Sequence, residues 1–186
     1  MSQLKIYKTH PDVVLPEFGT QQAACFDIAF HHSGKTEYTG YNSYNVKFTR
    51  ELNKYTNYRI ILMPGDRIMV PTGLIFDIPE GYSIRIHPRS GLSFKQGLVL
   101  ANLEAVIDSD YVDETYILLT NQSQNSREIL NGDRIAQAEL VQQIKYEIVE
   151  TFEAPKQKTD RIGGLGSTGV STILEKRGPG RPKKVA

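Results

Sequence analysis

The chain has 186 residues, 39% of them hydrophobic and 23% charged, which fits one globular domain with room for an insertion or tail and excludes wholesale disorder. One cysteine and four histidines without ligand spacing exclude a disulfide framework and a multi-cysteine zinc site, and argue against a histidine-rich metal centre. All 21 acidic residues lie in residues 1–175 beside 17 of the 22 basic ones, so a body of formal charge −4 precedes a basic tail.

The N-terminus, Met1-Ser-Gln-Leu-Lys5, has no apolar core of the kind that a signal peptide needs. No later apolar run approaches the roughly 20 residues that span a bilayer. We therefore expect a soluble, cytoplasmic protein with no membrane partner. A nuclear location would be open only if the source were eukaryotic.

Apolar residues then recur mostly with a period of two, which is typical of half-buried β-strands. In 82–87, for example, Tyr82, Ile84 and Ile86 point one way while the residues between them point the other. Gly- and Pro-containing turn signals at 63–66, 79–81 and 131–133 separate these runs. The pattern predicts an all-β fold, either a sandwich, a jelly roll or a small barrel, with one helical turn at 90–95. The expected strands are 67–70, 74–76, 82–87, 116–119, 135–141 and 146–149.

Two regions differ from this pattern. Residues 31–58 hold five of the ten tyrosines but only Val46 and Leu52 as aliphatic residues, so we expect an insertion that forms a long loop or an exposed hairpin. From about Ala154 the chain is rich in Gly, Ser, Thr, Lys and Pro, which predicts a mobile arm. The predicted organisation is a β-domain over 1–153, a glycine-rich arm over 154–169 and a basic tail over 170–186.

Four stretches are more polar than their β context requires, and each has an ordinary alternative. Residues 87–92 combine Arg, Ser and Gly after a strand, which fits a phosphate cradle or a plain turn. Residues 105–111 place Asp108 and Asp110 near a strand end, which fits a general base, a Mg²⁺ ligand or an acidic hairpin tip. Residues 131–137 read as a hairpin with two further polar donors, and 161–169 as a phosphate-binding glycine strip or a linker.

Taken together and in order, the segment Ala24-Cys-Phe-Asp-Ile28 and these four stretches resemble the five motifs of the trimeric dUTPase family, whose members are dUTP nucleotidohydrolases. The resemblance covers residues 3–30 and 59–169 and leaves out 31–58 and 170–186. The matching segments are Ala24-Cys-Phe-Asp-Ile28, Pro88-Arg-Ser-Gly-Leu92, Asn102 to Glu114, Gly132-Asp-Arg-Ile-Ala-Gln137 and Arg161 to Gly169.

The resemblance implies a β jelly roll that assembles into a homotrimer, with the C-terminal arm of one subunit closing over a site built by the others. It implies hydrolysis of dUTP to dUMP and pyrophosphate, which lowers dUTP and supplies dUMP for thymidylate synthesis. It also implies Mg²⁺ as cofactor, held mainly by the triphosphate with no direct protein ligand.

The resemblance assigns roles to individual residues. Asp108 would activate the water that attacks the α-phosphorus, and Tyr111 would pack on the deoxyribose and exclude UTP. Asn102 and the backbone at Val106 and Ile107 would bind the uracil edge. The remaining residues would bind phosphate, cover the base or support these charges: Arg89, Ser90, Gly91 and Gln137, then Arg161, Leu165, Gly166 and Ser167 on the arm, with Asp27 and Arg134 as supporting charges. For Asp27 and Arg134, an internal ion pair without a substrate role is the alternative.

The chain departs from the family pattern at several points. Cys25 and Ala105 stand where glycine is usual, and Val112-Asp113 replaces a polar residue and glycine. The fifth motif is one residue shorter, and Leu165 replaces a phenylalanine that stacks on uracil. Leucine can cover a base but offers no ring face.

Two other functions remain open at this point. The related dCTP deaminase needs a glutamate near 116–120, where this chain has no acidic residue. A dUTPase-like binding module or regulator is the other alternative, and the intact Asp108 and Tyr111 argue against it.

The tail, Arg177-Gly-Pro-Gly-Arg-Pro-Lys-Lys184, resembles an AT-hook. That resemblance implies that Arg181 enters the minor groove of A·T-rich DNA. A basic tail with only non-specific affinity is the alternative.

Overall fold

The computed structural model describes residues 3–159, which form a mostly β protein with one short helix. Its helical elements are the 3-10 turn η1 (Lys54–Thr56) and α1 (Ser90–Gln96). Its strands are β1 (Lys5–Lys8), β2 (Phe26–Ala29), β3 (Glu37–Tyr41), β4 (Lys47–Glu51), β5 (Ile60–Leu62), β6 (Arg67–Pro71), β7 (Leu74–Asp77), β8 (Tyr82–His87), β9 (Leu98–Leu100), β10 (Ala105–Ile107), β11 (Tyr116–Asn121), β12 (Arg127–Ile129) and β13 (Arg134–Gln142).

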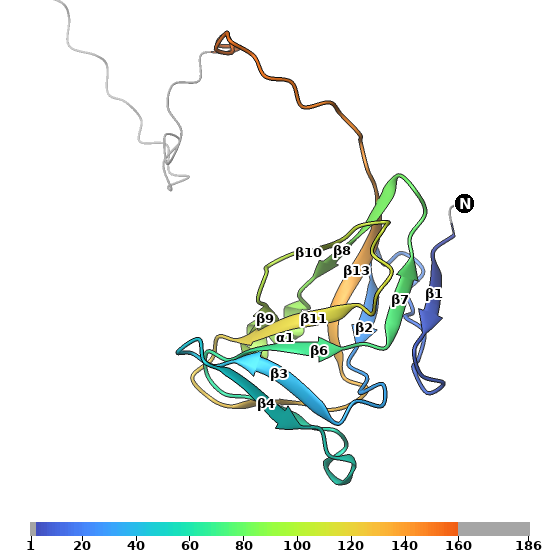
Figure 1. Ribbon diagram of the computed structural model, residues 1–186, viewed down its shortest axis with the longest axis vertical. Helices are drawn as coiled ribbons and strands as arrows, with labels where there is room; N and C mark the ends of the chain where they lie inside the picture. The colour runs from blue at the N-terminus through green and yellow to red at the C-terminus, as the bar shows by residue number, and fades with distance from the viewer. Residues whose placement is uncertain (1–2, 160–186) are drawn as a thin grey trace, which may run out of the picture. The chain divides into compact units, whose positions relative to one another are not determined.

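The strands pair antiparallel into two large sheets and two small ones. The four-stranded sheet has the order β10-β8-β13-β2, and the five-stranded sheet has the order β4-β3-β6-β11-β9. In Figure 1 the strands of the five-stranded sheet run across those of the four-stranded sheet. Both sheets contribute to one buried apolar cluster, which includes Ile28, Ile84 and Ile86 from the first and Ile68, Val70 and Ile117 from the second. The two sheets therefore enclose a common core, as the predicted all-β class requires.

Most of the expected strands are present, because their alternating residues bury one face against this core. Five of the six predicted runs lie within β6, β7, β8, β11 and β13, and the expected helical turn is α1. In β8, Ile84 and Ile86 are fully buried while Arg85 and His87 stay partly exposed.

The strand predicted at 146–149 is wrong. Residues 143–159 contain no helix or strand, and Tyr146, Ile148 and Val149 are 80%, 89% and 70% exposed. Alternation marks an apolar face, but a strand also needs a partner, and no described strand pairs with this segment. Residues 147–159 belong to a separate unit of the chain.

Residues 31–58, expected to be a loop or an exposed hairpin, form the β3–β4 hairpin. β3 pairs with β6, so the hairpin adds two strands to one side of the five-stranded sheet. It is only partly exposed: Tyr38 and Leu52 are buried, whereas Tyr44 and Tyr55 face solvent. No helix in residues 3–159 has the length and hydropathy that a membrane crossing requires.

Candidate functional site

A polar pocket of about 540 Å³ lies where α1 begins, beside β2 and β13. Five residues that the sequence predicted as ligands or supporting charges line it: Asp27, Arg89, Ser90, Gly91 and Gln137. Lys95, which sequence reasoning did not single out, also lines the pocket and adds a positive charge. A pocket with two cations and the first N–H groups of a helix suits an anionic ligand.

Asp27 fixes the arginines of this pocket. Its carboxylate receives Arg89 Nε at 2.8 Å on one oxygen and Arg134 Nη1 at 2.9 Å on the other. Arg89 Nη1 also donates to the Arg134 carbonyl at 2.9 Å. The guanidinium of Arg89 is therefore held through two of its nitrogens, Nε and Nη1. Asp27 and Arg134 form an ion pair, with Arg89 as a third member.

Gln137 occupies the centre of the four-stranded sheet, opposite His87 on β8 and opposite Asp27 on β2. Its Nε2 donates to the Pro88 carbonyl at 3.0 Å. This bond turns the side chain toward the strand-to-helix connection, so Gln137 and the first turn of α1 face the same pocket.

The second group of predicted residues lies on β10 and on the 108–114 loop that follows it. This stretch is not a β-hairpin, because β10 pairs with β8 while β11 belongs to the five-stranded sheet. β10 is an edge strand that pairs with β8, and Val106 points outward at 45% exposure while Ile107 packs against the core. Asp108 follows the strand and is exposed, and its carbonyl accepts the Tyr111 N–H at 3.1 Å. Tyr111 is 40% exposed.

The residues of β10 and of the 108–114 loop are not among those that line the pocket beside Arg89. Asn102 instead lines a separate groove with Met69 and Leu118 on the five-stranded sheet. The structure thus gathers Arg89, Ser90, Gly91 and Gln137 in one pocket, whereas the predicted sugar and water ligands lie on the 108–114 loop and Asn102 lines the separate groove.

A charged cluster that sequence reasoning missed connects β10 with β8 and β13. His87 lies 3.5 Å from a carboxylate oxygen of Glu104 through Nδ1 and 3.2 Å from one of Glu139 through Nε2, and Arg85 lies 3.7 Å from Glu104. The outward-pointing positions of β8 were visible in its alternation. The acidic partners are Glu104, just before β10, and Glu139 on β13. The sequence does not show that β10 and β13 are the neighbours of β8.

Cys25 lines the same pocket as Arg89. Burial, reinforced by the carboxylates of Glu139 and Asp27, raises the pKa of its thiol above the usual value. The neutral thiol is the less nucleophilic form, which argues against a role for Cys25 in covalent chemistry.

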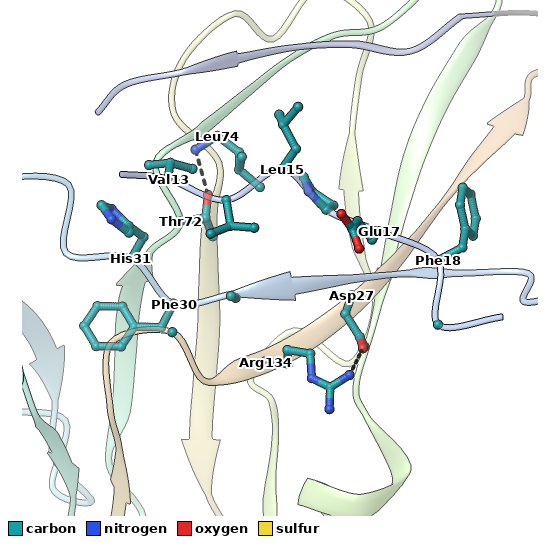
Figure 2. Close-up of a pocket in the computed structure, with 15 residues that line it drawn as sticks. Val13, Leu15, Glu17, Phe18, Asp27, Phe30, His31, Thr72, Leu74 and Arg134 are labelled. Atoms are coloured by element: carbon teal, nitrogen blue, oxygen red, sulfur yellow. Dashed lines mark hydrogen bonds and ion pairs between the residues drawn. The ribbon is translucent and has the colours of Figure 1, made fainter. Parts of the chain in front are cut away.

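A second pocket, of about 440 Å³, lies under the segment 13–19 and has mainly apolar walls. Figure 2 shows Val13, Leu15, Phe18 and Phe30 around it, with the Asp27–Arg134 ion pair at one end. Thr72 at the other end accepts the Leu74 N–H at 3.2 Å. The polar groups at both ends are thus already paired, so the pocket beside Arg89 is the better candidate for an anionic ligand.

Several predicted residues lie outside the described part of the chain. These are Arg161, Leu165, Gly166 and Ser167 of the arm and Arg181 of the tail.

Comparison with known proteins gives consistent matches. The sequence profile of the dUTPase family matches residues 52–169. The deoxyuridine 5'-triphosphate nucleotidohydrolase of Nautilia profundicola is 37% identical over 168 residues, which cover 90% of this chain and 99% of the relative. The enzyme of the same name from Brucella melitensis is 46% identical over 114 residues, or 61% of this chain and 71% of the relative.

Solved structures share the fold. A mutant of the Staphylococcus bacteriophage 80alpha dUTPase with dUpNHpp superposes with a TM-score of 0.70 at 21% identity, covering 91% of this chain and 100% of the other. A mutant of the dUTPase from phage phi11 of S. aureus, described with a structural Mg(II) ion, gives a TM-score of 0.62 at 20% identity, covering 82% and 98%.

Proposed function

The chain belongs to the dUTPase family and hydrolyses dUTP as a dUTP diphosphatase, and we propose that it does so with the pocket beside Arg89 and the 108–114 loop that carries Asp108. The observation that supports this assignment is the convergence of Asp27, Arg89, Ser90, Gly91 and Gln137 on one pocket. The absence of an acidic residue at 116–120 goes against deamination of dCTP.

The pocket would bind the triphosphate. Arg89, oriented by Asp27, offers a guanidinium N–H to a phosphate oxygen, and Lys95 adds a second charge. Ser90 supplies a hydroxyl and, with Gly91, backbone N–H groups, while the Gln137 amide meets an adjacent oxygen. Donors that are already oriented lose little entropy on binding, and they stabilise the charge that develops as the bond to the leaving group breaks.

Asp108 would act as the general base. It takes a proton from a water molecule that attacks the α-phosphorus, and the bond to the β-phosphate oxygen breaks to release pyrophosphate and leave dUMP. A positioned base typically contributes about 10²–10⁴-fold to the rate. The exposed carboxylate at the end of β10 has the access to water that this role needs.

Asn102, β10 and the 108–114 loop would also set the specificity for the nucleotide substrate. The Tyr111 ring packs on the deoxyribose and leaves no room for a 2′-hydroxyl. Asn102 and the backbone at Val106 and Ile107 bind the uracil edge, where a 5-methyl group would clash. Discrimination against UTP and dTTP would thus come from steric exclusion.

Magnesium would enter with the substrate. Within residues 3–159, no three side chains of His, Cys, Asp or Glu come together as a metal cage. We propose that the ligands of the magnesium ion are mainly triphosphate oxygens and water, since Mg²⁺ prefers oxygen ligands and keeps several waters. When bound, the ion neutralises charge on the phosphates.

A complete site would need more than one subunit. The pocket beside Arg89 and the 108–114 loop lie apart in the single chain. This separation supports a jelly-roll homotrimer in which the 108–114 loop of one subunit meets the pocket of another. The arm residues Arg161, Leu165, Gly166 and Ser167 would then close over the nucleotide. Truncation after Ala154 should leave the assembly intact in light scattering and cripple turnover. A monomeric truncation product would mean that the arm holds the subunits together instead.

The tail would add affinity for A·T-rich DNA through Arg181, since the acidic body repels DNA. Deletion of 176–186 should abolish DNA binding and leave dUTP hydrolysis unchanged. Equal affinity for A·T-rich and G·C-rich duplex at one salt concentration would contradict an AT-hook.

Turnover by the purified full-length chain tests the proposed chemistry. We expect dUMP and pyrophosphate in equal amounts from dUTP, with oxygen from labelled water recovered in dUMP, because attack is at the α-phosphorus. Label recovered in pyrophosphate would contradict the proposed attack. Ammonia from dCTP, or no turnover at all, would contradict the function.

A further inference from the structure

The carboxylate of Glu114 collects three donors at the end of the 108–114 loop. Lys35 Nζ lies 2.5 Å and Tyr116 OH 3.1 Å from Oε2, and the Gly73 N–H donates to Oε1 at 2.9 Å. The Glu114 side chain is only 12% exposed. A carboxylate this far from water is costly unless its oxygens are paired, so the three donors act together to hold it.

Glu114 is in turn joined to the predicted sugar platform. Its own carbonyl accepts the Tyr111 hydroxyl at 3.0 Å. The next residue, Thr115, donates its N–H to the Leu74 carbonyl at 2.8 Å, which ties the end of the loop to the start of β7. A shift of Glu114 would therefore move the group that orients the Tyr111 ring.

Lys35 comes from the segment 31–58 and precedes residues 52–169, which the dUTPase family profile matches. A tight turn presents it: the Lys35 N–H donates to the His32 carbonyl at 2.8 Å, and Ser33 and Gly34 have positive φ angles of 52° and 77°. The imidazole Nδ1 atoms of His31 and His32 accept the N–H groups of Ser33 and Gly34. The turn is thus fixed by side chains as well as by the backbone.

The Lys35 ammonium is in an environment that keeps its charge. Burial alone would lower its pKa, but hydrogen bonds to Glu114 and Tyr116 and the negative charge of Glu114 raise the pKa of Lys35 overall. The ammonium also lies 5.4 Å from the centroid of the Tyr116 ring. Lys35 is two-thirds buried as a side chain, so it is part of the packing as well as an ion-pair partner.

We propose that Lys35 is a positioning residue for the hydrolysis of dUTP: the segment 31–58 holds the Glu114 carboxylate through Lys35 and so sets the loop that carries Asp108 and Tyr111. This inference rests on the proposed roles of Asp108 and Tyr111. It gives the segment 31–58 a function, namely to support the 108–114 loop through the contact of Lys35 with Glu114.

The test replaces Lys35 by Met in the full-length protein and measures kcat and KM for dUTP and for UTP. We expect kcat/KM for dUTP to fall by about 10-fold or more and the preference for dUTP over UTP to fall with it, because small displacements of a positioned group are costly. Lys35→Arg, which keeps the charge, should recover most of both. Lys54→Met is the matched control: it removes an exposed lysine of the same segment and should change neither quantity.

A double-mutant cycle separates positioning from simple loss of stability. If the pair acts as a unit, Lys35→Met and Glu114→Gln together should cost little more than the larger single change. Thermal unfolding of each variant shows whether it is folded at the assay temperature. If Lys35→Met does not fold, Lys35→Arg and Glu114→Gln still give the dUTP-to-UTP ratio.

An unchanged dUTP-to-UTP ratio in folded Lys35→Met or folded Glu114→Gln would contradict the inference. That outcome differs from failure of the proposed function. If the unmodified chain hydrolyses dUTP and Tyr111→Ala relaxes the exclusion of UTP, the proposed function stands and only the role of Lys35 falls.

Discussion

At the scale of single residues, one carboxylate organises the proposed phosphate pocket. Asp27 is 20% exposed and accepts from both Arg89 and Arg134, so it determines how two cations are arranged. A negative charge beside a phosphate site weakens phosphate binding by repulsion, yet without it the guanidinium groups would lose their fixed orientation. We infer that orientation is the more valuable property here, because phosphate binding by arginine depends on the direction of its N–H groups.

Asp27→Asn tests this inference through stability and catalysis together. Removing the charge should lower the free energy of unfolding by about 1–2 kcal/mol, since in a partly buried site one charged donor loses its acceptor and the other keeps only a neutral one. It should also raise KM for dUTP. Asp77→Asn is the matched control, because the Asp77–Lys5 pair is largely exposed and worth at most about 1 kcal/mol. Urea unfolding and steady-state kinetics measure both effects, and equal losses in the two variants would contradict a special role for Asp27.

Asp108→Asn tests the general base. The amide keeps the shape of the side chain but cannot accept a proton from water, so kcat should fall by about 10²-fold or more with little change in nucleotide affinity. Asp113→Asn, in the same exposed loop, should turn over dUTP normally. Near-normal kcat for Asp108→Asn would remove Asp108 from the mechanism.

At the scale of elements, periodicity predicted the long strands and missed the short ones. A run such as 135–141 shows its buried face in sequence, but the three residues of β5, β9 or β12 are too few to show a period. The segment 146–149 has the two-residue period of a strand, but no described strand pairs with it. The hairpin of 31–58 was open to two predictions because its buried residues, Tyr38 and Leu52, are far apart in a mostly polar sequence.

The turn between β6 and β7 offers a test at this scale. Gly73 has a φ of +70°, and a Cβ there would lie 2.4 Å from Val13 Cγ2 and 2.5 Å from Ser33 Oγ. Gly73→Ala should therefore destabilise the protein by more than the roughly 1–2 kcal/mol of left-handed strain alone. Gly81→Ala isolates that strain, because Gly81 has a φ of +82° and no atom within 4 Å of its Cβ position. Equal losses in thermal unfolding would contradict the steric contribution.

At the scale of the whole molecule, sequence motifs predicted a group of residues that line one pocket, but not how the separate groups of predicted residues are arranged. Five predicted residues do converge on one pocket, because their motifs lie on strands that pair and on the helix that follows. Lys35, Glu104 and Glu139 could not be found in this way, since their partners come from distant parts of the chain. A contact such as Lys35 with Glu114 depends on sheet order, which periodicity does not encode.

His31 and His32, at the start of the segment 31–58, predict how the free energy of unfolding changes with pH. Burial, with repulsion from the neighbouring histidines, lowers the pKa of His31 and of His32, although Asp12 acts in the opposite direction on both and Glu114 does so on His31. The unfolded chain then takes up protons first as the pH falls below about 6.5. The stabilising contribution of the two neutral imidazoles to the free energy of unfolding should be complete above that pH and be lost below it. The slope should be at most about 1.4 kcal/mol per pH unit for each ring.

Urea unfolding between pH 7.5 and 5.5 measures this slope. His31→Asn should flatten it, because the amide oxygen can still accept the Ser33 N–H but does not titrate. An identical slope in the variant would assign the pH dependence to other groups.

The pairing of β2 with β13 also has a consequence for how the protein is made. Asp27 lies opposite Gln137, and its partner Arg134 follows it by 107 residues. At about 5–20 residues per second on the ribosome, β2 waits roughly 5–20 s before the strand that completes its sheet has been synthesised. During that interval the emerging chain displays Phe26 and Ile28 without their native cover. The pocket beside Arg89 is therefore a late product of translation, and chaperones that shield apolar strands would act on this protein before it can bind nucleotide.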